Sequence, residues 1–240
     1  TYSVVGATAN GCEGTDSVTV TVLTGNPVTA SAGNDQQICA GESATLTASG
    51  GSSYLWSNGE TGESITVSPT STTTYGVTAY DSSGTNSDTD EVTVTVNALP
   101  VAEAGSNVSI CRGASVTLTA SGGDSYLWET GATTASITVS PNNTRTYTVE
   151  VTSNGCTDTD EVRVTVNAQP NVDAGPNVTI SLGESTVLTA SGAASYQWST
   201  GAGSPSITVS PSVTTTYSVV GATANGCEGT DSVTVTVLTG

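Results

Sequence analysis

Cysteines and clustered carboxylates are the side chains of this 240-residue chain whose type and spacing point to chemistry. The cysteines are Cys12, Cys39, Cys111, Cys156 and Cys227. Such residues form disulfides in proteins that reach an oxidising compartment. The carboxylate clusters are Asp88, Asp90 and Glu91, and Asp158, Asp160 and Glu161. Carboxylate oxygens are hard ligands of the kind that Ca²⁺ prefers. The chemistry open to the chain is therefore cross-linking and cation binding.

The composition excludes most enzyme chemistry. The chain has no His, Lys, Met or Phe, so a Ser/His/Asp triad, a Schiff base, a phosphate-loop lysine and a histidine metal site are all impossible. A glycosidase-like carboxylate pair would need a cleft that small β-modules do not obviously supply. We therefore predict that the protein is not an enzyme and needs no cofactor, with Ca²⁺ as the one cation considered.

The net charge of −18 argues against two classes of partner. An acidic chain repels nucleic acid and anionic lipid, so neither is an expected partner. No apolar run approaches the roughly 18 residues of a membrane span. The N-terminal residues also lack the pattern of a signal peptide. We expect a processed chain, or a window on a longer one, without membrane insertion.

The sequence repeats with a period near 72 residues. The string Leu-Thr-Ala-Ser occurs at 46–49, 118–121 and 188–191, and Ile-Thr-Val-Ser-Pro occurs at 65–69, 137–141 and 207–211. Three modules are predicted, at 26–98, 99–168 and 169–240. The aromatic residues Trp56, Trp128, Trp198, Tyr75, Tyr147 and Tyr217 recur at fixed places and are expected in the cores.

Residues 1–25 are identical to residues 216–240. They correspond to the last two strands of a module and could not bury their valines alone. The exact repeat is therefore a triplet of modules, and we expect the chain to be part of an array of near-identical triplets. The alternative is a separate subunit whose first 25 residues complete the sheet of a neighbour.

The apolar residues predict an all-β fold. They alternate with Thr or Ser at 43–49, 64–68 and 92–96, which is the period of half-buried strands. About seven short strands in 70 residues, with Trp on the third and Tyr at the start of the sixth, match a small Ig-like (PKD-like) antiparallel β-sandwich. In this match the Tyr would form a tyrosine corner. Short linkers with Pro100 and Pro170 predict a stiff tandem rod.

The modules resemble the Ig-like/PKD-like repeats of giant secreted surface proteins of gliding Bacteroidota, including their motility adhesins. The resemblance rests on an Ala-Gly-x-Asp/Asn start at 32–35, 104–107 and 174–177, the Cys-x-Gly turn, Tyr-x-Trp, Ser-Pro and the Asn-Gly-Cys loop. It covers essentially the whole chain, and it implies export to the cell surface in a very long polypeptide. Ser17 and Ser232, each in an Asp-Ser-Val string, resemble the O-glycan acceptors of this group, and the start of a strand is the other interpretation of the string.

The cysteine distribution predicts disulfides between modules. Module 1 has only an early cysteine, Cys39, module 2 has both Cys111 and Cys156, and module 3 has only the late Cys227. Joining each early site to the late site of the next module gives Cys39–Cys156 and Cys111–Cys227, with Cys12 paired outside the chain. The alternative is Cys111–Cys156 within module 2, with the others free or joined as Cys12–Cys39.

The acidic clusters have two interpretations. They lie at module ends, where converging oxygens could bind Ca²⁺. Asp90, Asp160 and Asp231 also share strand parity with inward valines, so each needs a partner, and a loop cap that accepts backbone N–H groups is the other interpretation.

Two kinds of partner follow from these features. The chain itself is the expected partner, by end-to-end continuation. Arg112, Arg145 and Arg163 of module 2 suit a lateral contact with acidic surfaces of neighbours, and solvated single charges are the other interpretation. The predicted function is a structural repeat of an extracellular filament, stalk or giant surface protein. The alternative is a surface adhesin whose modules bind a glycan or protein ligand.

Overall fold

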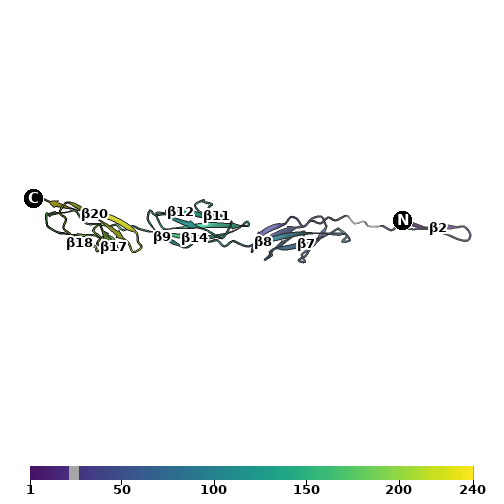
Figure 1. Ribbon diagram of the computed structural model, residues 1–240. Coiled ribbons are helices and arrows are strands. Elements are labelled where there is room, and N and C mark those ends of the chain that lie inside the picture. The colour runs from purple at the N-terminus through teal and green to yellow at the C-terminus, as the bar shows by residue number, and fades with distance from the viewer. Residues whose placement is uncertain (22–26, 240) are drawn as a thin grey trace. The chain divides into compact units, whose positions relative to one another are not determined.

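The computed structural model describes residues 1–21 and 27–239, and every regular element in this part of the chain is a β-strand (Figure 1). The first hairpin consists of β1 (Tyr2–Ala7) and β2 (Glu13–Val18). The first module consists of β3 (Gln36–Cys39), β4 (Ala44–Thr47), β5 (Ser53–Trp56), β6 (Ser64–Val67), β7 (Thr73–Tyr80) and β8 (Ser87–Asn97). None of the described residues forms a helix that could cross a lipid bilayer.

The second and third modules repeat the pattern of the first. The second module consists of β9 (Val108–Cys111), β10 (Val116–Thr119), β11 (Ser125–Trp128), β12 (Ser136–Val139), β13 (Arg145–Ser153) and β14 (Cys156–Asn167). The third consists of β15 (Val178–Ser181), β16 (Thr186–Thr189), β17 (Ser195–Trp198), β18 (Ser206–Val209), β19 (Thr215–Ala222) and β20 (Glu228–Leu238).

Each module is a sandwich of two sheets with the same strand order. In the first module, β3, β8, β7 and β5 form one sheet in that order, and β4 pairs with β6 in the other. The strand β3 runs parallel to β8, whereas all other pairs are antiparallel. Two such layers around one core make an Ig-like β-sandwich. The all-β Ig-like fold predicted from the sequence is therefore present three times.

The Ala-Gly-x-Asp/Asn motif marks the place where the first segment of a module moves from one sheet to the other. In the first module, Ser31 exchanges backbone hydrogen bonds with Ser49 beyond β4, whereas β3 pairs with β8. Gly33 lies between them with φ at +86°, a conformation that side chains disfavour. The Asp35 side chain then accepts the N–H of Thr93 at 2.8 Å. Asn107 and Asn177 make the same bond in the other modules.

The alternation of apolar residues with Thr places one face of each strand in a core. Along β7 the inward Tyr75, Val77 and Ala79 are buried, and their neighbours are more exposed. Each module has its own cluster, centred on Trp56, Trp128 or Trp198. The indole N–H of Trp56 donates to the carbonyl of Gly62 at 2.9 Å, so the buried ring leaves no polar atom unpaired.

Two details of the predicted sandwich were wrong. Each module has six strands rather than about seven, because the chain from Trp56 to Ser64 crosses between the sheets without pairing as a strand. Tyr75 therefore begins the fifth strand and not the sixth. In the described part of the chain, the hydroxyls of Tyr75, Tyr147 and Tyr217 also make no hydrogen bond of the kind that defines a tyrosine corner.

The hydroxyl that is anchored belongs to the tyrosine of the Tyr-x-Trp motif. Tyr126 donates to the carbonyl of Gly123 at 2.9 Å, and Tyr54 and Tyr196 make the equivalent bond three residues back. These bonds fix the loop that leads into the third strand. Tyr75, Tyr147 and Tyr217 pack by their rings, as the core role predicted for them requires.

The chain divides into two compact units, Thr1–Leu99 and Pro100–Gly240. The first unit holds the hairpin β1–β2 and the first module. The second unit holds the second and third modules, so contacts between these two modules are contacts within one unit.

Candidate functional site

A disulfide joins Cys111 of the second module to Cys227 of the third. The two Sγ atoms lie 2.02 Å apart and the Cα atoms 5.5 Å apart, across 116 residues of sequence. Cys111 ends β9, beside Asn167 at the end of β14. Cys227 lies in the loop between β19 and β20 and is fully buried. The cross-link therefore connects the end of one sandwich to the loop of the next.

The loop that carries Cys227 has a defined shape. The N–H of Thr223 donates to the carbonyl of Cys227 at 2.9 Å, and the Thr223 hydroxyl accepts the N–H of Cys227 at 3.1 Å. Gly226 has φ at +80°, which is why Gly precedes the cysteine in the Asn-Gly-Cys motif. The amide of Asn225 donates to the side-chain oxygen of Asn167 at 3.2 Å, so a hydrogen bond accompanies the disulfide.

The other cysteines exclude the alternative pairing. Cys39 and Cys156 are each part of a disulfide, and Cys12 is a free, exposed thiol. Because Cys111 is bonded to Cys227, the pair Cys111–Cys156 within the second module is wrong. The pair Cys12–Cys39 is wrong as well, since Cys12 is free.

The acidic residues at the module ends accept backbone hydrogen bonds. In the first module, Asp88 accepts the N–H of Ala30 at 2.9 Å and Asp90 accepts that of Ala32 at 2.8 Å. Each aspartate projects inward from β8 and holds the first segment of its own module, which runs along the other sheet. The carboxylates thus bridge the two layers of the sandwich.

The other modules repeat this bridge. Asp158 and Asp160 accept the N–H groups of Ala102 and Ala104 at 2.9 and 2.7 Å. In the third module, Asp231 accepts the N–H of Ala174 at 2.8 Å. The partner that strand parity required for these aspartates is therefore the backbone of the module's own first segment.

The arrangement does not fit a calcium site. Within residues 1–21 and 27–239, no three Cys, Asp or Glu side chains are grouped closely enough to hold a metal ion. The aspartates turn inward to backbone donors, whereas Glu91 and Glu161 are exposed on the outer face. Alternation along the strand separates the carboxylates that the sequence places next to one another. Of the residues expected to bind Ca²⁺, the four aspartates instead accept backbone N–H groups of the first segment of their own module.

Hydrogen bonding lowers the pKa of three of the carboxyls, those of Asp90, Asp158 and Asp231, below the ordinary 3.8. The N–H of Ala32, followed by that of Glu91, lowers the pKa of Asp90, and burial opposes this only in part. Asp158 and Asp231 have lowered pKa values for the same reason, with Ala102 and Ala174 as the first donors. All three are charged at neutral pH and strengthen the bonds they accept.

A carboxylate closes the loop of the first module that lacks a cysteine. Asn86 stands six residues before the inward Val92, the place that Cys156 and Cys227 take in the other modules. The side chain of Asp81 accepts the N–H groups of Ser83 and Thr85 at 3.1 and 3.0 Å and the Asn86 amide at 3.1 Å. Burial raises the pKa of Asp81, but its hydrogen bonds, first the one that the Ser83 hydroxyl donates at 2.9 Å, outweigh it and the pKa lies below 3.8.

The role of Asp81 was not predicted from the sequence. The signal that could have found it is the Asp-Ser-Ser-Gly string, because an aspartate often accepts backbone bonds from the turn that follows it. Asp81 is only 7% exposed and is the one buried charged residue in the described chain.

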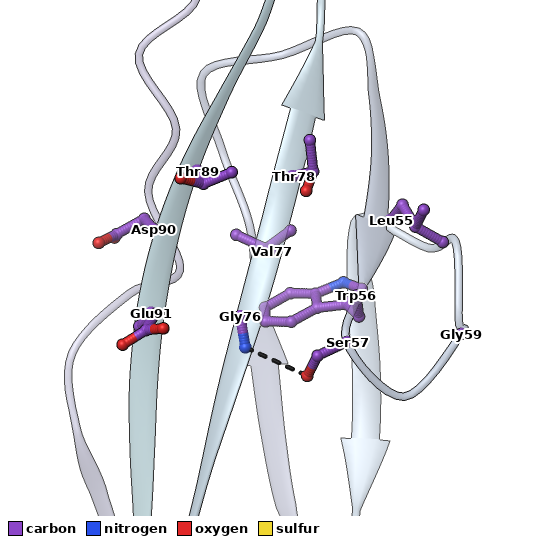
Figure 2. Close-up of a pocket in the computed structure, with 10 residues that line it drawn as sticks. All are labelled: Leu55, Trp56, Ser57, Gly59, Gly76, Val77, Thr78, Thr89, Asp90 and Glu91. Carbon is purple, nitrogen blue, oxygen red and sulfur yellow. Dashed lines mark hydrogen bonds between the residues drawn. The ribbon is translucent and has the colours of Figure 1, made fainter.

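A shallow groove of about 860 Å³ lies on the outer face of β5, β7 and β8 (Figure 2). Its lining includes Leu55, Gly76 and Glu91, and the Gly76 N–H donates to the Ser57 hydroxyl at 3.2 Å. Trp56 borders the groove but is only 1% exposed, so it offers no ring for a sugar to stack on. A related hollow beside Leu127 lies on the second module.

The remaining predicted residues lie at the surface. Ser17 and Ser232 are exposed on β2 and β20, so both stay candidate O-glycan acceptors. Arg145 forms an ion pair with Glu129 at 3.1 Å and lies 5.1 Å from the centre of the Tyr147 ring. Arg112 and Arg163 are exposed.

Comparison with solved structures returns tandem Ig-domain proteins. A titin I-band fragment of three domains, I67–I69, is 14% identical with a TM-score of 0.44 and matches 86% of this chain and 96% of that one. Sidekick-1 domains 1–4 are 14% identical with a TM-score of 0.34, over 88% and 76%. Extracellular domains 3–5 of Drosophila OTK are 11% identical with a TM-score of 0.34, over 91% and 97%. No protein-family model and no curated protein matches the sequence.

Proposed function

We propose that the protein is a structural repeat of an extracellular filament, stalk or giant cell-surface protein, stiffened by disulfides between its modules. The observation that carries this proposal is the Cys111–Cys227 bond, because it joins two sandwiches that each have a complete core of their own. Because the disulfide is not needed to complete either core, its main effect is to fix the arrangement of the two modules at their junction.

Short linkers support the same role. Only residues 168–172 separate the end of β14 from Asp173, which already pairs with Ser191 of the third module. Pro170 restricts this linker further. A short linker and a covalent bond beside it give two connections between the modules. Two connections resist bending and twisting where a single linker would not.

The cross-linking pattern extends the proposal beyond one junction. We assign Cys39 to Cys156 and Cys12 to a cysteine outside residues 1–240, so that each early site joins the late site of the next module. Where a third module meets a first, Ser181 stands at the early site and Asn86 at the late one, and both cysteines are replaced together. Stable disulfides support an extracellular location. The proposed role involves no catalysis and no cofactor.

Small-angle X-ray scattering of the full chain tests the stiffening. Reduction of the disulfides is expected to broaden the distribution of distances between modules while the sandwiches stay folded. The C111S/C227S double variant is expected to do the same without reductant, and Cys12→Ser serves as the control with unchanged scattering. Equal flexibility of the oxidised and reduced chains would contradict the proposal. Electron microscopy of native material then shows whether the array forms a filament.

The groove on the outer face favours a second candidate, a surface adhesin. Leu55 and Leu127 stand at equivalent positions on the edge strands β5 and β11, are 42% and 48% exposed, and each lines a hollow on its module. A protein or glycan ligand that covers this face would bind less tightly to the Leu55→Ser and Leu127→Ser variants. A screen against glycans and surface proteins, with the Ser199→Ala variant as control, distinguishes this candidate from the structural one.

A further inference from the structure

A hollow of about 530 Å³ lies on the second module, beside the loop that joins β12 to β13. Its lining includes Pro141, Asn142, Asn143, Arg145 and Tyr147. The loop reads Pro-Asn-Asn-Thr-Arg, whereas the same loop reads Pro-Thr-Ser-Thr-Thr in the first module and Pro-Ser-Val-Thr-Thr in the third. The other two modules therefore show which of these residues the loop itself requires.

The threonine that all three loops share has a structural role. The hydroxyl of Thr144 accepts the N–H of Val166 at 3.0 Å, and Thr72 and Thr214 make the same bond in their modules. This bond anchors the loop to the last strand of the sandwich. The residues at 142, 143 and 145 differ between modules that fold alike, so the fold does not explain them.

Two local hydrogen bonds of the other modules are replaced here. In the first module, Thr73 donates to the carbonyl two residues before it at 2.7 Å, and Ser57 accepts the N–H of Gly76 at 3.2 Å. The third module has the same two bonds. The second module has Arg145 and Glu129 at these positions, and within the described chain neither side chain makes the corresponding bond. It has exchanged two small hydroxyls for a pair of opposite charges.

The guanidinium of Arg145 is held in place from two sides. Its Nη2 lies 3.1 Å from Oε1 of Glu129, its Nε donates to the same oxygen at 3.2 Å, and it lies 5.1 Å from the centre of the Tyr147 ring. An exposed ion pair of this kind adds little stability. The contacts with Glu129 engage two of the five N–H donors of the guanidinium, which leaves three for a ligand. A donor that is already fixed loses less entropy on binding.

The rest of the hollow adds amides and a small apolar surface. Asn142 and Asn143 are exposed, and no hydrogen bond to another described residue occupies their side chains. Each amide offers two N–H donors and an acceptor oxygen. Val139 and Pro141 line the same hollow and are half-buried. The hollow thus combines several planar hydrogen-bonding groups with an aliphatic wall.

This combination matches a neutral, hydroxyl-rich ligand. A hydroxyl both donates and accepts, as the amides do, and the C–H face of a sugar ring can pack against Val139 and Pro141. An anion is a poorer match, because Glu129 neutralises Arg145 and the chain carries a net charge of −18. The volume lies within the range of small-molecule sites.

We propose that this hollow of the second module binds neutral saccharides, with Asn142, Asn143 and Arg145 as the hydrogen-bonding groups. Glu129 is the positioning residue that holds Arg145. The site belongs to one module of the three and is separate from the groove beside Leu55 of the first module. It goes beyond the structural role, for which the first and third modules do without these residues.

A ligand-observed NMR titration of the full oxidised chain tests the proposal. The probes are the methyl glycosides of glucose, galactose, mannose and N-acetylglucosamine, with glucuronic acid as the anionic probe. At least one neutral probe is expected to bind. The E129S/N142T/N143S/R145T variant carries the first module's residues at all four positions. It should bind that probe at least about tenfold more weakly, because several hydrogen bonds are lost at once. Its melting temperature should not fall, since the two local bonds can form again.

The matched control is Arg163→Thr, which removes an exposed arginine of the same module outside the hollow and introduces the residue of Thr93. Its binding should equal that of the original chain. The proposal is overturned if no neutral probe binds, if glucuronic acid alone binds, or if Arg163→Thr weakens binding as much as the fourfold variant. A fourfold variant that melts earlier and binds equally well would show a purely structural pair and also overturn it. Each of these failures leaves the Cys111–Cys227 bond and the stiffening test unaffected.

Discussion

The carboxylate of Asp90 accepts the backbone N–H of Ala32 at 2.8 Å and thereby ties the two sheets of the first module together. Asp90 belongs to β8 in the four-stranded sheet, whereas Ala32 follows Ser31, which pairs beyond β4 in the other layer. Ala32 is itself buried, so its N–H has no access to water as an alternative acceptor. A charged residue on the inward face of a strand is thus part of the fold.

Removal of this carboxylate should destabilise the first module. Asp90→Ala leaves the Ala32 N–H buried without an acceptor, which carries the desolvation penalty of an unpaired polar group. We expect a clear fall in the melting temperature of this module, measured by calorimetry. Glu91→Ala is the matched control on the next residue of β8 and should change the melting temperature little, because its side chain is exposed.

Stability should fall as the pH drops below about 4. The pKa values of Asp90, Asp158 and Asp231 are lower in the folded state than the ordinary 3.8, so the unfolded chain takes up protons first. Their contribution is complete above the unfolded pKa and is lost as the pH falls through the folded pKa. Urea denaturation between pH 2 and 7 measures it. The triple Asp→Asn variant, which keeps an acceptor oxygen but does not titrate, should show a weaker acid dependence; an equal dependence would contradict this explanation.

The three cores should respond to mutation independently. Leu46, Leu118 and Leu188 occupy the same position in separate clusters and are at most 2% exposed. Truncation of each to Ala should cost its own module about 2–5 kcal/mol. Amide hydrogen exchange followed by mass spectrometry locates the loss, which should remain in the module that carries the change. A loss spread equally over all modules would mean that they unfold as one unit.

The tyrosine of the Tyr-x-Trp motif should contribute a hydrogen bond that the core tyrosine does not. Tyr126→Phe removes the bond to the Gly123 carbonyl and should cost the second module about 0.5–1.5 kcal/mol. Tyr147→Phe is the control, because its hydroxyl makes no such bond within the described chain. Chemical denaturation of both variants compares them directly. A larger loss for Tyr147→Phe would restore the tyrosine corner expected from the sequence.

Much of the fold could be predicted because it depends on local pattern. Alternation of valine with threonine and the recurrence of the Tyr-x-Trp motif are visible in the letters, and both follow from the two-residue period of a strand. The need of Asp90 for a partner was visible for the same reason. The partner itself was not, since it depends on how the segment around Ala32 crosses from one sheet to the other.

The details that were predicted wrongly also depend on tertiary structure. Whether Tyr126 or Tyr147 has the anchored hydroxyl depends on where a loop carbonyl lies. A tyrosine stands at both positions in every module, so the sequence does not distinguish them. The acidic residues at 158, 160 and 161 form a cluster in sequence, but the strand turns Glu161 away from Asp158 and Asp160. Sequence proximity therefore suggested a cation site, but the alternation of side chains along the strand places these carboxylates on opposite faces.

Peptide mapping of the native, unreduced protein tests the central claim most directly. After proteolysis with free thiols blocked, mass spectrometry should recover the peptide of Cys111 bonded to that of Cys227, two residues 116 positions apart in different modules. The same digest should recover Cys39 bonded to Cys156. Recovery of Cys111 bonded to Cys156 would place the cross-link inside the second module and contradict the account of modules locked to their neighbours.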